Sequence, residues 1–431
     1  MTKNKPGFSE AFWFWLKLGC ISFGGPTGQI ALMHTELVEK KKWIDEPRFL
    51  HALNFCMLLP GPEAQQLAIY IGWLLHRTWG GIVAGAFFVI PSIFVLLALS
   101  WTYVAYGKVP WVAAIFDGLK PAVMAIVAHA VIHIGRKALK NAVMFAVAGL
   151  AFVAIFFGKA PFPLIILAAA VIGFIGGLKW PRYFVLTKRD GEDGESVAAK
   201  AAKGAARPTL MRALKVIAIW SVLWWTPVLL LGLWQGWGSV FVKEGVFFSK
   251  AAMVTFGGAY AVLPYVAQAA VEQYGWLQPG QMMDGLGLAE TTPGPLIMVL
   301  QFVGFLGGWH NPGNLPPWLA GTIAGLITTW TTFVPCFLWI FLGAPYVERL
   351  YGQKRLSAAL SAITAAVVGV VLNLAVWFGW NTLVPQQGPF NWFALVVGLG
   401  AFAGLWRWKW DVVPVVLGSG VLGLAYHWLA K

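Results

Sequence analysis

Two Pro-Gly-Pro triplets are the strongest candidates for a functional site in this chain. The first PGP triplet, residues 60–62, and the second, residues 293–295, each interrupt an apolar run. Proline stops the preceding helix and suits the first turn of the next one, so each triplet predicts a break followed by a new half-helix. Free N–H groups and the helix dipole make such an N-terminus attractive to anions. Because broken backbone persists in lipid only where it is buried in protein or lines a cavity, the triplets predict an anion site.

Two glycine pairs predict a second type of break. The first glycine pair is Gly24-Gly25 and the second is Gly257-Gly258, each preceded by a hydroxyl residue and phenylalanine. Four half-helix N-termini, two from each half of the chain, are then able to converge on one small oxyanion, with neutral hydrogen-bonding side chains around it. The candidate binding residues are Ser22, Gly24, Gly25, Thr27, Gln29, Asn54, Gly61, Gln65, Gln66, Thr255, Gly257, Gly258, Thr291, Thr292 and Gly294. Taken singly, each Gly, Ser or Thr has close helix packing as its alternative role.

Charged residues inside the apolar runs are few, and such residues mark functional sites in membranes. Glu63 and Glu290 lie beside the two PGP triplets, and we expect them to act in coupling or gating. For Glu63, a carboxylate that caps its own helix is an equal alternative. Asp117 and Lys120 are one helical turn apart, a spacing that allows them to pair. Lys120 is also a candidate binding residue that supplies positive charge to an anion, and Asp117 is a third candidate for coupling or gating.

The elements that position these residues are membrane helices. The 431 residues are 59% hydrophobic and 11% charged, whereas soluble domains carry about 25% charged residues. We therefore predict an all-α polytopic membrane protein, and the 25 Trp residues suit membrane interfaces. Because no metal-ligand cluster, nucleophile constellation or phosphate-binding loop is present in the sequence, we expect no metal, no cofactor and no enzymatic activity. The net charge of +14 comes from short loops and indicates orientation in the membrane, not nucleic-acid binding.

The sequence contains an internal duplication. The glycine pairs and the PGP triplets of the two halves are all separated by 233 positions. We predict a first transporter repeat at 1–178, a cytoplasmic linker at 179–215, a connecting transmembrane span at 216–234 and a second repeat at 235–431. The thirteen expected apolar segments are 8–32, 49–75, 79–105, 110–134, 141–157, 161–178, 216–234, 245–271, 280–308, 318–343, 356–379, 390–406 and 411–429.

The number of segments and the basic residues predict orientation. Seven segments separate the two repeat starts, an odd number, so the repeats enter the membrane from opposite faces, as in many transporters. If segments 8–32 and 49–75 re-enter instead of crossing, one face receives twenty-four Lys and Arg residues and the other receives four. If they cross, the cluster at residues 40–48 lies on the opposite face; both alternatives stay open. In either case the N-terminus and linker are cytoplasmic and the C-terminus is outside.

The motifs around the breaks resemble those of a known family. Residues 17–73, with SFGGP and LLPGPEAQQ, and their second copy with TFGGA and TTPGPL are similar to the chromate ion transporter family in its long-chain, two-domain form. The resemblance implies chromate transport across the bacterial inner membrane, generally efflux that confers chromate resistance, with sulfate as a look-alike substrate. Another oxyanion or a channel-like pathway is the alternative, and a homodimer is compatible with the sequence. The first glycine pair precedes Pro26 and the second precedes Ala259, so the two halves need not contribute equally to the site.

Overall fold

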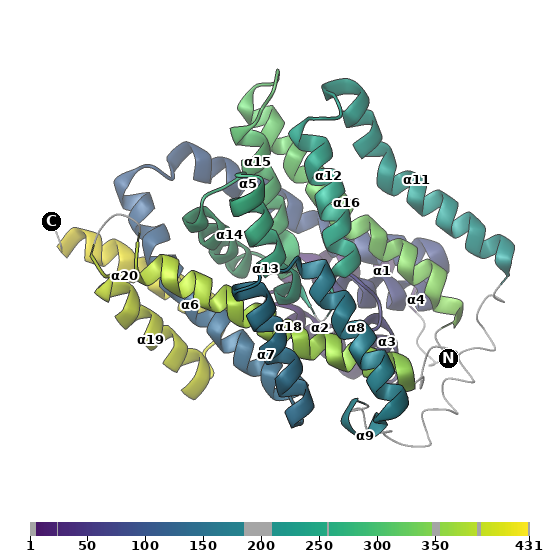
Figure 1. Cartoon of the computed structure of the whole chain (residues 1–431). Coiled ribbons are helices and arrows are strands. Elements are labelled where there is room, and N and C mark those ends of the chain that lie inside the picture. Colours follow the sequence, from purple (N-terminus) through teal and green to yellow (C-terminus); the bar gives the residue numbers. More distant parts are fainter. Residues whose placement is uncertain are drawn as a thin grey trace.

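Every regular element in the described part of the chain is helical. The computed structural model describes residues 6–23, 25–184, 209–256, 258–346, 354–385 and 389–429. A helix satisfies its backbone hydrogen bonds within one segment, which a chain of this composition requires in lipid. The structure confirms the predicted all-α polytopic membrane protein, and Figure 1 shows the arrangement of its helices.

The elements of the two halves follow one another in a similar order. The first half contains α1 (Phe8–Ile21), α2 (Gly25–His34), the π-helix η1 (Thr35–Lys40), α3 (Glu46–Cys56), α4 (Glu63–Phe87), α5 (Ile90–Tyr106), α6 (Pro110–Ala138), α7 (Ala142–Phe156), α8 (Phe162–Lys179) and α9 (Pro181–Phe184). After the linker come α11 (Leu210–Gln235), α12 (Val240–Val254), α13 (Ala259–Gln268), the π-helix η2 (Ala269–Gln273), α14 (Pro279–Thr291), the 3-10 turn η3 (Leu296–Met298), α15 (Val299–His310), α16 (Pro317–Gly343), η4 (Ala344–Tyr346), α18 (Lys354–Leu383), α19 (Trp392–Arg407) and α20 (Val412–Leu429). A π-helix follows α2 in the first half and α13 in the second half.

Helix length separates full spans from shorter arms. Seven helical stretches of the described residues are long and apolar enough to cross a membrane: Glu63–Tyr106, Pro110–Ala138, Phe162–Lys179, Leu210–Gln235, Pro317–Gly343, Arg355–Leu383 and Val412–Leu429. By contrast, α1, α2 and α3 have 14, 10 and 11 residues. At about 1.5 Å per residue, each of these arms is shorter than the ~30 Å hydrocarbon core.

One predicted boundary, the start of the connecting span, differs in the structure, and another, near residue 77, agrees. The connecting helix α11 begins at Leu210 and not at residue 216, because Thr209 caps it by accepting the N–H of Arg212. The predicted linker at 179–215 lies mostly outside the described residues, which resume at 209. Within α4, His76 and Arg77 leave the helical conformation, and Arg77 has a φ of +57°. The chain therefore turns between the predicted segments 49–75 and 79–105.

The two halves exchange their long helices. Helix α6 of the first half packs against α19 and α20 of the second half, and α18 of the second half packs against α7 and α8 of the first. Figure 1 shows α19 and α20 beside α6, and α7 and α8 beside α18. Small residues allow these contacts: Gly118 of α6 lies against Gly423 of α20, and Gly369 of α18 lies against the Ala148 carbonyl of α7. Helices α6 and α18 also contact each other.

Candidate functional site

All four predicted breaks interrupt helices in the structure. Helix α1 ends before the first glycine pair and α2 begins at Gly25, and α3 ends before the first PGP triplet while α4 begins at Glu63. In the second half, α13 begins at Ala259 and η3 at Leu296, directly after their breaks. The positions agree with the local chemistry, because proline ends one helix and suits the start of the next.

Each PGP triplet is hydrogen-bonded to the glycine break of the other half. The Gly61 N–H donates to the Thr255 carbonyl at 2.8 Å, and the Gly294 N–H donates to the Ser22 carbonyl at 2.7 Å. The two donors are 233 positions apart in the sequence and so are the two acceptors, so the bonds form a reciprocal pair. The four breaks therefore meet in two cross-half contacts, and two N–H groups at the PGP triplets are already engaged there.

Glycine is required at both triplets by conformation and by space. The φ of Gly61 is +118° and that of Gly294 is +110°, which L side chains rarely adopt. A Cβ on Gly61 would lie 2.9 Å from both Cys336 Sγ and Gln66 Nε2, and a Cβ on Gly294 would overlap Ser92 Oγ. Ser92 in turn donates to the Pro293 carbonyl at 2.7 Å.

Three buried glutamines of the first half hold the broken backbone. Gln29 Nε2 donates to the Gly294 carbonyl at 2.5 Å, and Gln66 Nε2 donates to the Pro60 carbonyl at 2.7 Å. Gln65 Nε2 donates to the Gly85 carbonyl at 3.3 Å, which directs it toward the second part of α4. The amide oxygens of all three residues are buried without a hydrogen-bond partner among the described residues. Gln29 and Gln66 thus belong to the break region, whereas Gln65 supports the fold beside it.

The hydroxyl groups expected to contact an oxyanion donate within their own helices. Ser22 Oγ donates to the Leu18 carbonyl at 2.6 Å, and Thr255 Oγ1 donates to the Ala251 carbonyl at 2.7 Å. The hydroxyls of Thr291 and Thr292 likewise donate to carbonyls of α14, at 3.0–3.2 Å. This back-bonding is typical of Ser and Thr in helices. The N–H groups that lack an intrahelical acceptor in the first turns of α4 and α13 are therefore the more available donors. The Ala261 N–H of α13 is not among them, because it donates to the Gly258 carbonyl at 3.1 Å.

The remaining candidates differ in position. Asn54 is exposed near the end of α3, and its side chain makes no hydrogen bond in the described part of the chain. Gly25 begins α2 with a φ of +67° and has open space around it. Gly24, Gly257 and the side chain of Thr27 lie outside the described residues.

The two predicted carboxylates have different partners in the structure. Glu63 is the first residue of α4, and its Oε1 lies 3.5 Å from the position that a Cβ on Gly258 would occupy. The side chain therefore reaches the N-terminus of α13 in the other half; no capping bond to its own helix is present. Glu290 is buried and accepts the Tyr260 hydroxyl at 2.5 Å, within the second half.

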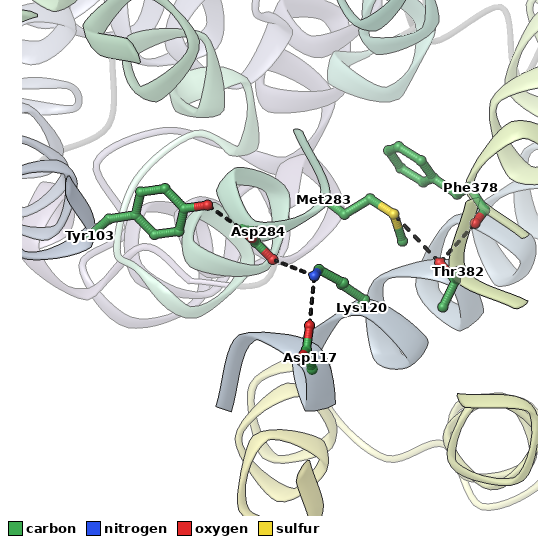
Figure 2. A network of polar contacts seen from close by, with 7 residues as sticks. All are labelled: Tyr103, Asp117, Lys120, Met283, Asp284, Phe378 and Thr382. Atoms are coloured by element: carbon green, nitrogen blue, oxygen red, sulfur yellow. Dashed lines mark hydrogen bonds and ion pairs between the residues drawn. The ribbon is translucent and has the colours of Figure 1, made fainter. Parts of the chain in front are cut away.

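Lys120 forms the predicted pair with Asp117, with 2.7 Å between Nζ and Oδ1. A buried carboxylate that the sequence reasoning missed lies on its other side: Asp284 of α14, whose Oδ1 is 4.0 Å from Lys120 Nζ. Tyr103 of α5 donates to Asp284 Oδ2 at 2.8 Å. Figure 2 shows Lys120 between the two carboxylates. Asp284 lies in the apolar segment 280–308. The search for charged residues inside apolar runs, which identified Glu290, was therefore sufficient to identify Asp284 as well.

Glu244 of α12 is a second buried carboxylate that was missed. It is fully buried, and its Oε2 accepts the Thr328 hydroxyl at 3.4 Å. Its Oε1 lies against Gly307 and has no hydrogen-bond partner among the described residues. Glu244 lies one position before the predicted apolar segment 245–271. For that reason it was not counted as a charge inside the membrane. In the described ranges no three His, Cys, Asp or Glu residues form a potential metal site.

Comparisons with known proteins agree over nearly the whole chain. The family described as chromate transporter matches residues 9–174 and 243–424. The chromate transport protein of Pseudomonas aeruginosa is 31% identical over 433 residues, which covers 96% of this chain and 92% of that protein. The chromate transport protein of Cupriavidus metallidurans is 29% identical over 418 residues, with the same coverage of 96% and 92%. The uncharacterized transporter YwrB of Bacillus subtilis is 31% identical over 126 residues, or 29% of this chain and 64% of that protein. No solved structure matches the chain.

Proposed function

Because the chain belongs to the chromate transporter family, we propose that it carries chromate out of the cytoplasm across the bacterial inner membrane. The family is one of transporters and not of enzymes. Two relatives that cover 96% of the chain are chromate transport proteins, which supports chromate as the substrate. Efflux of this anion confers resistance on the cell.

The reciprocal hydrogen bonds between the halves carry the proposal for the mechanism. Gly61 is bonded to Thr255 and Gly294 to Ser22, so each half fixes the broken backbone of the other. In alternating access, one half rocks against the other around a bound substrate. A displacement of the halves necessarily changes these two bonds, because each bond joins the two halves. The site that alternates between the two faces is therefore proposed to lie at the four breaks.

The oxyanion is held by helix N-termini in this proposal, and one lysine lies on its path. The first turns of α4 and α13 carry free N–H groups and the positive ends of their helix dipoles. Glu63 extends from the start of α4 to Gly258 at the start of α13, so these two N-termini lie close together. A resident carboxylate there occupies a position that also suits a substrate oxyanion, which gives Glu63 a gating role. Lys120 adds positive charge on the path along α14.

Membrane potential favours the proposed direction. Moving one charge through 100 mV changes its free energy by about 2.3 kcal/mol. The free energy of a dianion therefore falls by about 4.6 kcal/mol when it leaves a cell whose interior is about 100 mV negative. Export therefore requires no obligatory coupling partner on energetic grounds. The proposed orientation has the N-terminus and the linker in the cytoplasm and the C-terminus outside, with inverted repeats, as the distribution of basic residues favours.

Chromate flux through purified protein tests the proposal. Protein is reconstituted into liposomes loaded with chromate, and release is followed spectroscopically after a lumen-negative potential is imposed. We expect release to saturate with chromate concentration and to be accelerated by external chromate, because alternating access supports exchange. Liposomes without protein are the control. Absence of potential-driven release would refute the proposed substrate, and release without saturation or exchange would favour a channel-like pathway.

Sulfate is the second substrate to measure in the same liposomes. Sulfate and chromate are both tetrahedral dianions, so donors at helix N-termini bind both by the same geometry. We expect sulfate to compete with chromate for release. Transport of sulfate with no transport of chromate would assign the chain a different oxyanion while leaving the mechanism in place.

A further inference from the structure

We propose that Asp284 is a proton-binding residue that controls how strongly Lys120 attracts the oxyanion. The inference rests on the proposed function, since it concerns the same transported anion, and it assigns a role to a residue on α14 that lies away from the four breaks. Asp284, Lys120 and Tyr103 form the network in Figure 2.

The carboxylate of Asp284 is buried and only partly compensated. Its side chain is 7% exposed, and Oδ2 accepts the Tyr103 hydroxyl at 2.8 Å. Oδ1 is buried and has no hydrogen-bond partner in the described residues. Burying a charge is costly unless it is paired and hydrogen-bonded, so this oxygen requires either a closer cation or a proton.

Lys120 is held away from Asp284 by a competing carboxylate. Its Nζ donates to Asp117 Oδ1 at 2.7 Å but lies 4.0 Å from Asp284 Oδ1, beyond hydrogen-bond distance. The side chain of Asp117 is 67% exposed, whereas that of Asp284 is 7% exposed. Lys120 therefore lies between an outer, exposed acid and an inner, buried acid.

The groups that face Asp284 are few and come from two helices. Tyr103 comes from α5, and Lys120 and Asp117 come from α6. Among the other described helices packed on α14, α15 places Phe302 against Gly285 and α18 places Thr382 near Met283 Sδ, neither of which is charged. Helix α20 also packs on α14, and its titratable Tyr426 and His427 belong to its last turn. A proton on Asp284 is thus the simplest way to change the charge around Lys120.

Proton binding and anion binding are then linked. When Asp284 is ionised, its negative charge neutralises part of the field of Lys120, and a dianion near Lys120 is repelled. When Asp284 holds a proton, Lys120 is opposed only by Asp117, and the oxyanion binds more tightly. By reciprocity, the bound oxyanion favours the protonated form of Asp284. Because Lys120 lies in the first half and Asp284 in the second, the same change alters a contact between the halves.

Chromate binding measured against pH tests the inference. Protein in lipid nanodiscs is titrated with chromate by calorimetry from mildly acidic to mildly alkaline pH, in buffers of different ionisation enthalpy, which reports protons taken up per chromate bound. For the wild type we expect the Kd to rise with pH by at least about fivefold, the lower end of typical coupling. For Asp284→Asn we expect a low Kd that loses this dependence, together with reduced proton uptake. Chromate's own protonation contributes equally to every variant, so only differences between variants are compared.

Three further variants make the outcome decisive. Asp411→Asn removes an exposed acid between α19 and α20 and should retain the wild-type pH dependence. Asp117→Asn should tighten binding but keep the pH dependence, because Asp284 remains. Tyr103→Phe removes the hydroxyl donor from ionised Asp284 and should move the midpoint of the pH dependence to higher pH, which keeps the test valid if Asp284→Asn does not fold.

The outcomes separate this inference from the proposed function. Unchanged pH dependence and proton uptake in Asp284→Asn, or in Tyr103→Phe when the first variant does not fold, would overturn the role of Asp284 while chromate binding stands. Absence of chromate binding in the wild type at every pH would refute the proposed substrate, and the inference with it. Tighter chromate binding in Asp284→Asn than in the wild type, with a smaller pH dependence and a smaller proton uptake, would support it.

Discussion

Replacing Gly61 by alanine should strongly reduce chromate transport without preventing membrane insertion. Gly61 has a φ of +118°, and its N–H makes one of the two reciprocal bonds between the halves. A Cβ at this position would be strained whatever the space around it, and it would also lie 2.9 Å from Cys336 Sγ and Gln66 Nε2. The substitution therefore disturbs both the backbone of the break and the side chains that hold it.

The structure gives the size of the expected effect. A non-glycine residue in this backbone region costs about 1–3 kcal/mol. Displacing Gln66 from the Pro60 carbonyl adds the loss of one hydrogen bond, about 0.5–1.5 kcal/mol. The total is about 1.5–4.5 kcal/mol against the arrangement described here, which corresponds to a reduction in the transport-competent population of at least about tenfold.

Potential-driven chromate release from liposomes is the assay, with size-exclusion chromatography as the measure of folding. Gly149→Ala is the matched control, because Gly149 is exposed in α7 with nothing near its Cβ position, and it should transport like the wild type. Adding Cys336→Ala to Gly61→Ala removes one of the two close contacts and should restore part of the flux. Wild-type flux in Gly61→Ala would refute the reasoning, and full restoration by Cys336→Ala would show that backbone strain contributes nothing.

Three other predictions concern the buried carboxylates and the topology. Glu244→Gln should raise stability by about 1–3 kcal/mol, because it replaces a buried, partly unsatisfied carboxylate; a lower melting temperature in detergent would contradict this. Tyr260→Phe removes the hydroxyl donor of Glu290, a bond to a charged group worth about 1.5–3 kcal/mol, and should lower chromate flux about tenfold or more, so unchanged flux would exclude a role for that pair. Lys41→Cys, in a background without the exposed Cys20, should react with an impermeant thiol reagent from the cytoplasmic face if segments 8–32 and 49–75 re-enter; reaction only from outside would show that they cross.

The helix breaks were predictable from sequence because their causes are local. Proline and glycine determine backbone conformation within a few residues, so the ends of α3 and α14 and the starts of α4 and η3 follow from the two PGP triplets. The pairing of Asp117 with Lys120 follows from helical spacing in the same way. Both predictions required knowledge of one segment only.

The side-chain partners at the site were not predictable because they depend on packing between segments. Asp284 and Lys120 are 164 positions apart and meet only because α14 packs on α6. Asn54 was expected to contact the oxyanion, and the structure shows it exposed on α3. The hydroxyl of Thr255 was expected to hydrogen-bond the oxyanion, and in the structure it donates to the Ala251 carbonyl of its own helix. Spacing in sequence contains none of this information.

The exchange of α6 and α18 between the halves has a consequence for how the protein is built. A chain cut within residues 185–208 yields two pieces, each with a long helix whose main packing partners belong to the other piece. Neither piece then has a complete interior alone, so co-expressed pieces should assemble, whereas each expressed singly should be degraded. Substitutions are constrained in the same pairwise manner: a larger residue at Gly118 meets Ser419 and Gly423 of the other half. The two halves therefore depend on each other for packing, and a change at a contact in one half is tolerated only if the other half accommodates it.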